Sequence, residues 1–223
     1  VCNHLTAGAW PIIKGGTAGD QYVLTNLGAN HATGTNVILW VDVLVGAGNI
    51  SANTTTTTTV NTSALTRKTS GENVCYTYEV SAALGATGSN VTTTYTNQAG
   101  TGSRSSGAIA MTASAIVGRL QPVQNGWMGP LQAGDTGVRS IQSTAFSAAM
   151  GAGVVIAWLF NPLCFVPSLA ATTFPERSTP ASIGGLIRLE EGSDSALPCM
   201  GAFVLTSTTS TGVQTYFTQT AWG

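Results

Sequence analysis

The sequence predicts an all-β fold, namely a single-domain β-sandwich that is jelly-roll-like and carries an irregular N-terminal arm. Three observations predict it. About ten or eleven short segments have the composition of strands, with turn signals roughly every 8 to 15 residues. No segment shows the apolar spacing of an amphipathic helix. The chain of 223 residues is long enough for one sizeable core, and no stretch resembles a linker between two cores.

The predicted arm covers residues 1–20, and the predicted sandwich domain covers residues 21–223. The arm contains Pro11 and shows no repeating apolar period. Its large apolar side chains require burial, either on their own domain or on a neighbouring copy of the chain. These side chains are Trp10, Ile12 and Ile13.

The first strands of the sandwich follow the arm. We expect a short strand at 21–27, a loop rich in Gly, Asn and His at 28–35, and a main core strand at 36–47. In the core strand, side chains alternate between two faces. One face holds Val37, Leu39, Val41, Val43 and Val45, and the other holds Ile38, Trp40, Asp42 and Leu44. A buried Asp42 is expected to be satisfied by backbone donors rather than to be catalytic.

The middle of the chain is predicted to contain short strands separated by polar loops. They are a polar strand within 51–62 that includes six consecutive threonines, a turn at 67–73, a half-buried strand at 74–80, a loop at 85–90, a strand at 91–97, a polar loop at 98–107, a short strand at 108–111 and a turn-rich loop at 120–130. Disorder is the alternative for the threonine run, Thr54 to Thr59.

Residues 133–163 are the expected centre of the fold. Gly134 to Gly137 favour a turn, after which 138–146 alternate between two faces. The apolar run 154–160 is typical of a strand buried on both faces, and Asn161-Pro162 is expected to end it. A membrane span is the competing interpretation, but a spanning helix needs about 20 apolar residues and this run breaks after roughly ten.

The C-terminal part is predicted to close the sandwich. Residues 167–185 contain Pro175 and Pro180 and are expected to be irregular. A strand is expected at 186–190. The last two strands, 200–207 and 213–219, are expected to pair with each other as a hairpin.

The low charge of the chain limits its partners. Only 8% of residues are charged, and 8 Lys and Arg balance 9 Asp and Glu to a net charge of −1. Nucleic-acid binding draws affinity from clustered cations, so this balance argues against it. A surface of hydroxyls and amides brings neighbouring copies together without desolvating many ions, which favours an assembled protein.

Four cysteines, Cys2, Cys75, Cys164 and Cys199, lie far apart and show no CxxC spacing for zinc or redox chemistry. We expect free thiols and assembly in a reducing cytoplasm, although a Cys164–Cys199 disulfide is the alternative. Residues 1–10 lack the basic and apolar segments of a signal peptide.

Catalytic motifs are not found in the sequence. The histidines, His4 and His31, have no recognisable nucleophile context, and no nucleotide-binding motif occurs. Glu190 and Glu191 are adjacent and would point to opposite faces of a strand, which disfavours a glycosidase. Asp135 is expected to pair with Arg139 across its turn. We therefore expect no enzyme, no cofactor and no metal.

The runs VTTTYTNQAGTGSRSS (91–106), LQAGDTGVRSIQS (131–143) and VVIAWLFNPL (154–163) resemble virion structural proteins of tailed bacteriophages, especially capsid decoration or cement proteins. The resemblance spans about residues 75–165. It implies a sandwich that assembles, often as a homotrimer, on the major capsid protein and stabilises the head. It also implies a location on the capsid surface of the virion after assembly in the host cytoplasm, without nucleic acid or membrane as partners.

Subunit contacts are expected at Trp10, Ile12, Ile13 and Trp127. The alternative function is a tail-associated receptor- or carbohydrate-binding module, because an exposed Trp127 or Trp222 can stack on a sugar. A hydrolase acting on surface polysaccharide is the less favoured alternative.

Overall fold

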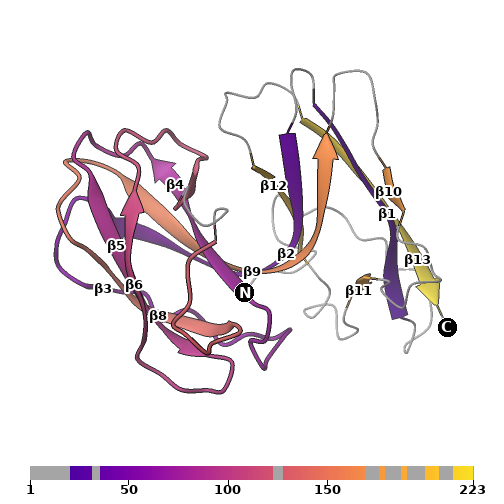
Figure 1. Ribbon diagram of the computed structural model, residues 1–223, viewed down its shortest axis with the longest axis horizontal. Coiled ribbons are helices and arrows are strands. Elements are labelled where there is room, and N and C mark those ends of the chain that lie inside the picture. Colours follow the sequence, from indigo (N-terminus) through magenta and orange to yellow (C-terminus); the bar gives the residue numbers. More distant parts are fainter. Residues whose placement is uncertain are drawn as a thin grey trace. The chain divides into compact units, whose positions relative to one another are not determined.

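The computed structural model describes residues 21–31, 36–122, 128–168, 176–178, 187–189, 199–205 and 213–222 (Figure 1). Every regular element in these ranges is a β-strand, which confirms the predicted all-β class. The strands are β1 (Gln21–His31), β2 (Asn36–Ser51), β3 (Thr58–Thr59), β4 (Cys75–Ala82), β5 (Ser89–Asn97), β6 (Arg104–Met111), β7 (Leu120–Gln121), β8 (Val138–Phe146), β9 (Val154–Ser168), β10 (Glu176–Ser178), β11 (Ile187–Leu189), β12 (Met200–Leu205) and β13 (Val213–Trp222). Within the described ranges, no helix could cross a bilayer.

Residue contacts divide the chain into two compact units. Unit 1 is Val43–Asn161, and unit 2 contains the described residues before Val43 and after Asn161. A single domain over 21–223 was expected, and that expectation stays a prediction. The boundary lies inside β2 and β9, which are continuous strands, and therefore no change of composition marks it. The predicted arm, 1–20, lies outside the described residues.

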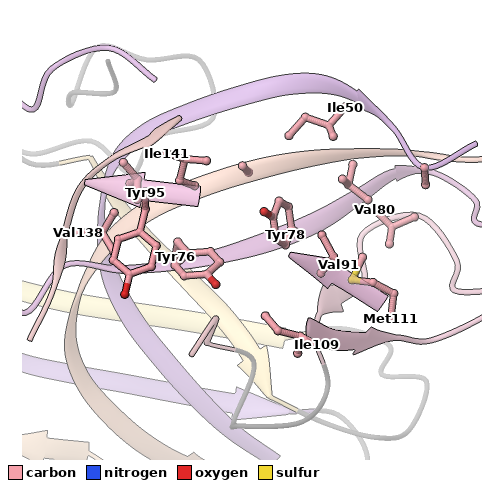
Figure 2. Packing of buried hydrophobic residues seen from close by; sticks show 14 of the residues in the cluster. Ile50, Tyr76, Tyr78, Val80, Val91, Tyr95, Ile109, Met111, Val138 and Ile141 are labelled. Carbon is pink, nitrogen blue, oxygen red and sulfur yellow. The ribbon is translucent and has the colours of Figure 1, made fainter. Parts of the chain in front are cut away.

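Unit 1 is a β-sandwich of two antiparallel sheets. One sheet contains β3, β8, β5 and β6 in that order. The other belongs to the sheet β12–β2–β9–β4–β7, of which β4, β7 and parts of β2 and β9 lie in unit 1. Buried residues of both sheets form one hydrophobic cluster, part of which is seen in Figure 2. This cluster includes Ile50, Tyr76, Val80, Val91, Ile109, Val138 and Ile141. The predicted sandwich is thus confirmed, and β5 shows why, since buried residues alternate with exposed or half-buried residues along its length.

Unit 2 contains non-local strand pairs that correct several predictions. β12 pairs with β2, and β13 pairs with β1 from Gln21 to His31. The predicted closing hairpin of 200–207 with 213–219 is therefore wrong. β1 continues through Gly28 to His31, where a loop was expected. β10 lies within the stretch 167–185 that was expected to be irregular, and it pairs with β1.

Several strand limits in unit 1 also differ from the predictions. The threonine run contributes only Thr58 and Thr59 to a strand. β6 begins at Arg104, inside the predicted polar loop 98–107. β9 continues past Pro162 to Ser168. Within β9, Val155, Ala157 and Leu159 are buried on one face. On the other face Phe160 is buried while Ile156 and Trp158 are half-buried, so burial on both faces holds only in part.

A buried hydroxyl network joins the two sheets of unit 1. The Tyr78 hydroxyl on β4 lies 2.8 Å from the Thr93 hydroxyl on β5 and 2.9 Å from the Thr144 hydroxyl on β8. All three side chains are fully buried. Burial raises the pKa of Tyr78, so its phenol stays protonated. The network fixes the position of one sheet on the other, because each hydroxyl depends on the others for a partner.

Replacing Tyr78 by Phe is expected to destabilise the protein by about 1–3 kcal/mol, because it leaves the buried Thr93 and Thr144 hydroxyls without their tyrosine partner. Urea unfolding followed by circular dichroism measures this change. The triple variant Y78F/T93V/T144V is the matched control and should recover most of the loss, because no buried hydroxyl is left without a partner. A Y78F variant as stable as wild type would contradict the role given to this network.

Candidate functional site

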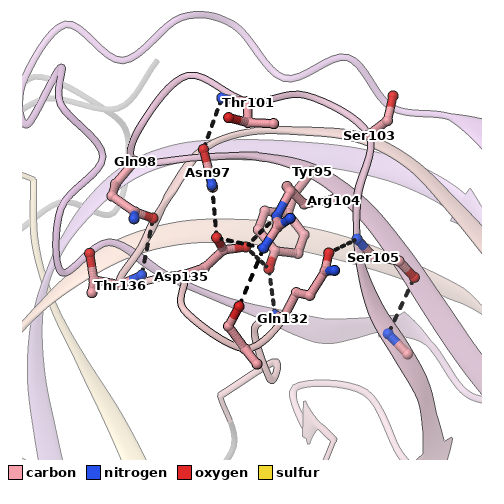
Figure 3. Close-up of polar contacts among 12 residues, drawn as sticks. Tyr95, Asn97, Gln98, Thr101, Ser103, Arg104, Ser105, Gln132, Asp135 and Thr136 are labelled. Atoms are coloured by element: carbon pink, nitrogen blue, oxygen red, sulfur yellow. Dashed lines mark hydrogen bonds and ion pairs between the residues drawn. The ribbon is translucent and has the colours of Figure 1, made fainter.

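Polar side chains gather where the β5–β6 hairpin meets the turn before β8 (Figure 3). We call Asp135, Tyr95, Asn97, Arg104 and Gln132 the Asp135 cluster. The Tyr95 hydroxyl donates to Asp135 Oδ2 at 2.7 Å, and Asn97 Nδ2 donates to Asp135 Oδ1 at 2.7 Å. Arg104 donates to both carboxylate oxygens, from Nε at 2.9 Å and from Nη2 at 3.0 Å. The backbone N–H of Gln132 donates to the Tyr95 hydroxyl at 2.6 Å.

Local structure explains how these residues meet. Alternation along β5 places Tyr95 and Asn97 on its buried face. Arg104 lies directly opposite Tyr95 in the β5–β6 register. Asp135 is held in its turn by a hydrogen bond from its N–H to the Gln132 carbonyl, and Gly134 adopts a positive φ of 87° that favours glycine. The strand register and this turn therefore bring the five residues together.

Charge pairing holds the Asp135 cluster in one protonation state. The Arg104 guanidinium, with help from Asn97 and Tyr95, lowers the pKa of Asp135 to about 2. Burial and the bond to Asp135 raise the pKa of Tyr95 to about 12, and the carboxylate also raises the pKa of Arg104. Because the carboxylate is saturated by donors and only weakly basic, it is suited to holding the two loops together rather than to proton transfer.

The pairing expected between Asp135 and Arg139 is wrong. Arg139 Nε donates instead to the carbonyls of Ser70, at 3.1 Å, and Gln98, at 3.0 Å. The β5–β8 register shifts twice, which leaves Arg139 and Gln142 as extra residues on β8. A bulge redirects a side chain and breaks the alternation of its strand. These bulges therefore explain why the predicted alternation over 138–146 is interrupted.

Both bulge residues bind neighbouring loops. Gln142 Oε1 accepts a hydrogen bond from the backbone N–H of Ser103 at 2.9 Å, and its carbonyl accepts from Val60 at 2.9 Å and Asn61 at 3.1 Å. Arg139 connects the Ser70 turn to the β5–β6 hairpin in the same way. The two bulge residues thus fix three loops, the Ser70 turn and the β5–β6 hairpin through their side chains and the Val60–Asn61 segment through the Gln142 backbone carbonyl.

Other charged side chains also bind within the fold. Arg67 is buried and donates from Nη2 to the Val43 carbonyl at 3.0 Å. Glu79 accepts a hydrogen bond from Trp158 Nε1 at 2.8 Å. The Asp42 carboxylate accepts a bond from the Cys199 N–H at 3.0 Å, which confirms the expected backbone donor. Little of this charge is left to face a partner.

Cysteine thiols and possible metal ligands are considered among the residues that the structure describes. Cys75 forms no disulfide, as expected, and no disulfide joins Cys164 to Cys199. Burial raises the pKa of Cys75 to about 11, so its thiol is a poor nucleophile at neutral pH. In the same part of the chain, no group of three or more His, Cys, Asp or Glu residues is placed to hold a metal ion. His4 and Cys2 lie outside it.

The predicted subunit contacts Trp10, Ile12, Ile13 and Trp127 all lie outside the described residues. They remain predictions. Of the two tryptophans considered for sugar stacking, Trp222 is the last residue of β13.

A second site was not predicted from the sequence. Hydrogen bonds join four loop segments of unit 1, at 52–57, 83–88, 112–118 and 147–153, which we call the uncharged end. None of these segments contains an Asp, Glu, Lys, Arg, His or aromatic residue. Ile116 and Val117 are 63% and 61% exposed, which is unusual for large apolar side chains. The half-buried Arg119 directly follows the third segment.

Backbone hydrogen bonds connect the four segments in a row. The third segment binds the second through Leu84 N to Ala115 O, 2.9 Å, and Ser114 N to Gly85 O, 2.8 Å. The second binds the fourth through Gly85 N to Ala152 O, 3.2 Å, and the fourth binds the first through Met150 N to Ala52 O, 2.9 Å. A Cβ at Gly85 would collide with the Met150 carbonyl, so glycine permits this close approach.

Comparisons with protein-family models, curated proteins and solved structures find no match for this chain.

The Asp135 cluster predicts an acid dependence of stability. Because the folded pKa of Asp135, about 2, lies below its ordinary 3.8, the carboxylate stabilises the fold fully above about pH 4 and loses this effect as the pH falls toward 2. Asp135→Asn should therefore be less stable than wild type at pH 7, with a difference in melting temperature that shrinks below pH 4.

Melting temperatures from pH 7 to pH 2 measure this difference. Glu72→Gln, which alters an exposed carboxyl outside the cluster, is the control and should follow wild type at neutral pH. A gap between wild type and D135N that is the same at pH 7 and pH 2 would show that the carboxylate charge is unimportant.

Proposed function

We propose that this chain is a non-enzymatic structural protein of a virus particle and that its unit 1 is a jelly roll. The strand order of unit 1 carries the proposal. β2 neighbours β9, β3 pairs with β8, β4 with β7, and β5 with β6. The pairs are therefore nested, like a long antiparallel ribbon closed by the β5–β6 hairpin and folded over into two sheets. This is the order expected of a jelly roll, an architecture of viral capsid proteins and of lectin domains.

The use of charge in unit 1 supports an assembling protein. Arg67, Arg104, Asp135 and Arg139 bind inside the fold. In the described part of unit 1, the exposed surface is consequently poorer in ions than its sequence alone indicates. Contacts between copies would bury hydroxyl, amide and methyl groups and would avoid the cost of desolvating charges.

The narrower form of the proposal is a capsid decoration or cement protein of a tailed bacteriophage. It would bind the major capsid protein and other copies of itself, as a homotrimer, on the outside of the head. Support comes from the resemblance of 91–106, 131–143 and 154–163 to such proteins. In the fold, the first two of these segments supply the Asp135 cluster, and 154–163 belongs to β9, a central strand of its sheet.

A carbohydrate-binding module is the alternative, because lectin domains share the jelly roll. Sugar binding favours exposed aromatic rings, and the four loops of the uncharged end contain none. The structural role is therefore preferred. Binding of the purified chain on a glycan array, lost in Trp127→Ala, would favour the alternative.

The proposed assembly should be almost insensitive to salt. Because few ion pairs are available for screening, the full chain should form an oligomer of defined mass in both 50 mM and 500 mM NaCl. Light scattering after size-exclusion chromatography measures the mass, and electron microscopy shows the particles. A chain that is monomeric at every concentration, or an oligomer that dissociates on raising the salt, would contradict the proposal.

A further inference from the structure

The uncharged end of unit 1 exposes two large apolar side chains, Ile116 and Val117. We propose that it is a self-association surface and that its partner is the same end of a second copy of this chain. This inference rests on the proposed structural function and deepens it by naming the surface. The juxtaposition that carries it is the exposed pair Ile116–Val117 beside three further loops that contain no ionisable side chain.

The chemistry of the surface disfavours other partners. Phosphate groups of nucleic acids and anionic lipids are bound by Lys and Arg, and the four segments contain neither. Sugars stack on aromatic rings, which are also lacking there. A strongly charged protein would find no complementary charge on it. The expected partner is therefore equally uncharged.

A second copy meets that requirement directly. Contacts between identical surfaces are limited by like charges that face each other across the symmetry axis. The four segments carry no such charge, and the half-buried Arg119, which ends the 116–119 turn, is the cation next to them. Its exposed residues include the alanines Ala83, Ala86, Ala149 and Ala152, which allow two backbones to approach closely. Two copies can therefore place these segments face to face with little repulsion between like charges.

The apolar tip is already ordered in the single chain. Arg119 N donates to Ile116 O at 3.2 Å, and Gly118 has φ of 81°, so residues 116–119 form a turn with Val117 at its first central position. Gly118 N also donates to the Val80 carbonyl of β4 at 2.8 Å. Association therefore requires little ordering of these loops, which favours binding.

Val117→Lys in the full chain tests the inference. Lysine fits the turn and leaves the core unchanged, but it places like charges opposite each other in the contact. Ala99→Lys is the matched control. It also adds a lysine at an exposed turn position, but after β5, at the opposite end of that strand from the uncharged end. Sedimentation velocity over a range of concentrations measures association, and thermal melting checks that both variants fold.

We expect V117K to require at least about tenfold more protein than wild type for half-association, with A99K close to wild type. If wild type associates and V117K associates equally well, the inference is wrong while the proposed function stands. If A99K weakens association as strongly as V117K, added charge acts generally and the inference is also wrong. If wild type remains monomeric at all concentrations, the proposed function fails, and the inference fails with it.

Discussion

Charged side chains of unit 1 bind carbonyls and polar groups inside the fold, and the rest of the structure depends on this use of charge. A buried or half-buried ion must be paired or hydrogen-bonded, since desolvation otherwise costs several kcal/mol. Arg139 binds two loop carbonyls, and Arg104 binds the carboxylate of Asp135. These bonds order the loops at one end of the sandwich. They also leave a surface composed mainly of hydroxyl, amide and methyl groups.

The sequence predicted those strands whose side chains alternate or are continuously apolar. Burial over 38–45 and the alternation of β5 follow from local pattern alone. Pairing between strands that are distant in the sequence does not follow from local pattern. β12 and β13 follow each other in the sequence, yet each pairs with a strand near the other end of the chain. A hairpin was expected because neighbouring strands usually pair, and nothing local in their composition contradicts it.

Neither site was visible in the sequence, for two physical reasons. Asp135 was expected to bind Arg139, four residues away, but a bulge turns Arg139 toward other loops and the register brings Arg104 to the carboxylate instead. The uncharged end consists of segments that each look like an ordinary loop of Ala, Gly, Ser and Thr. The lack of charged side chains that the four segments share becomes apparent only when the nested strand order brings them together.

An uncharged and ordered loop surface is proposed to bring copies of this chain together. Hydrogen–deuterium exchange of the full chain, compared between dilute and concentrated solutions, tests it most directly. If copies associate through this surface, exchange in 83–88 and 112–118 should become slower on concentration, with little change in the hairpin around Ala99. Protection that arises on concentration elsewhere, with exchange in these two segments unchanged, would contradict it.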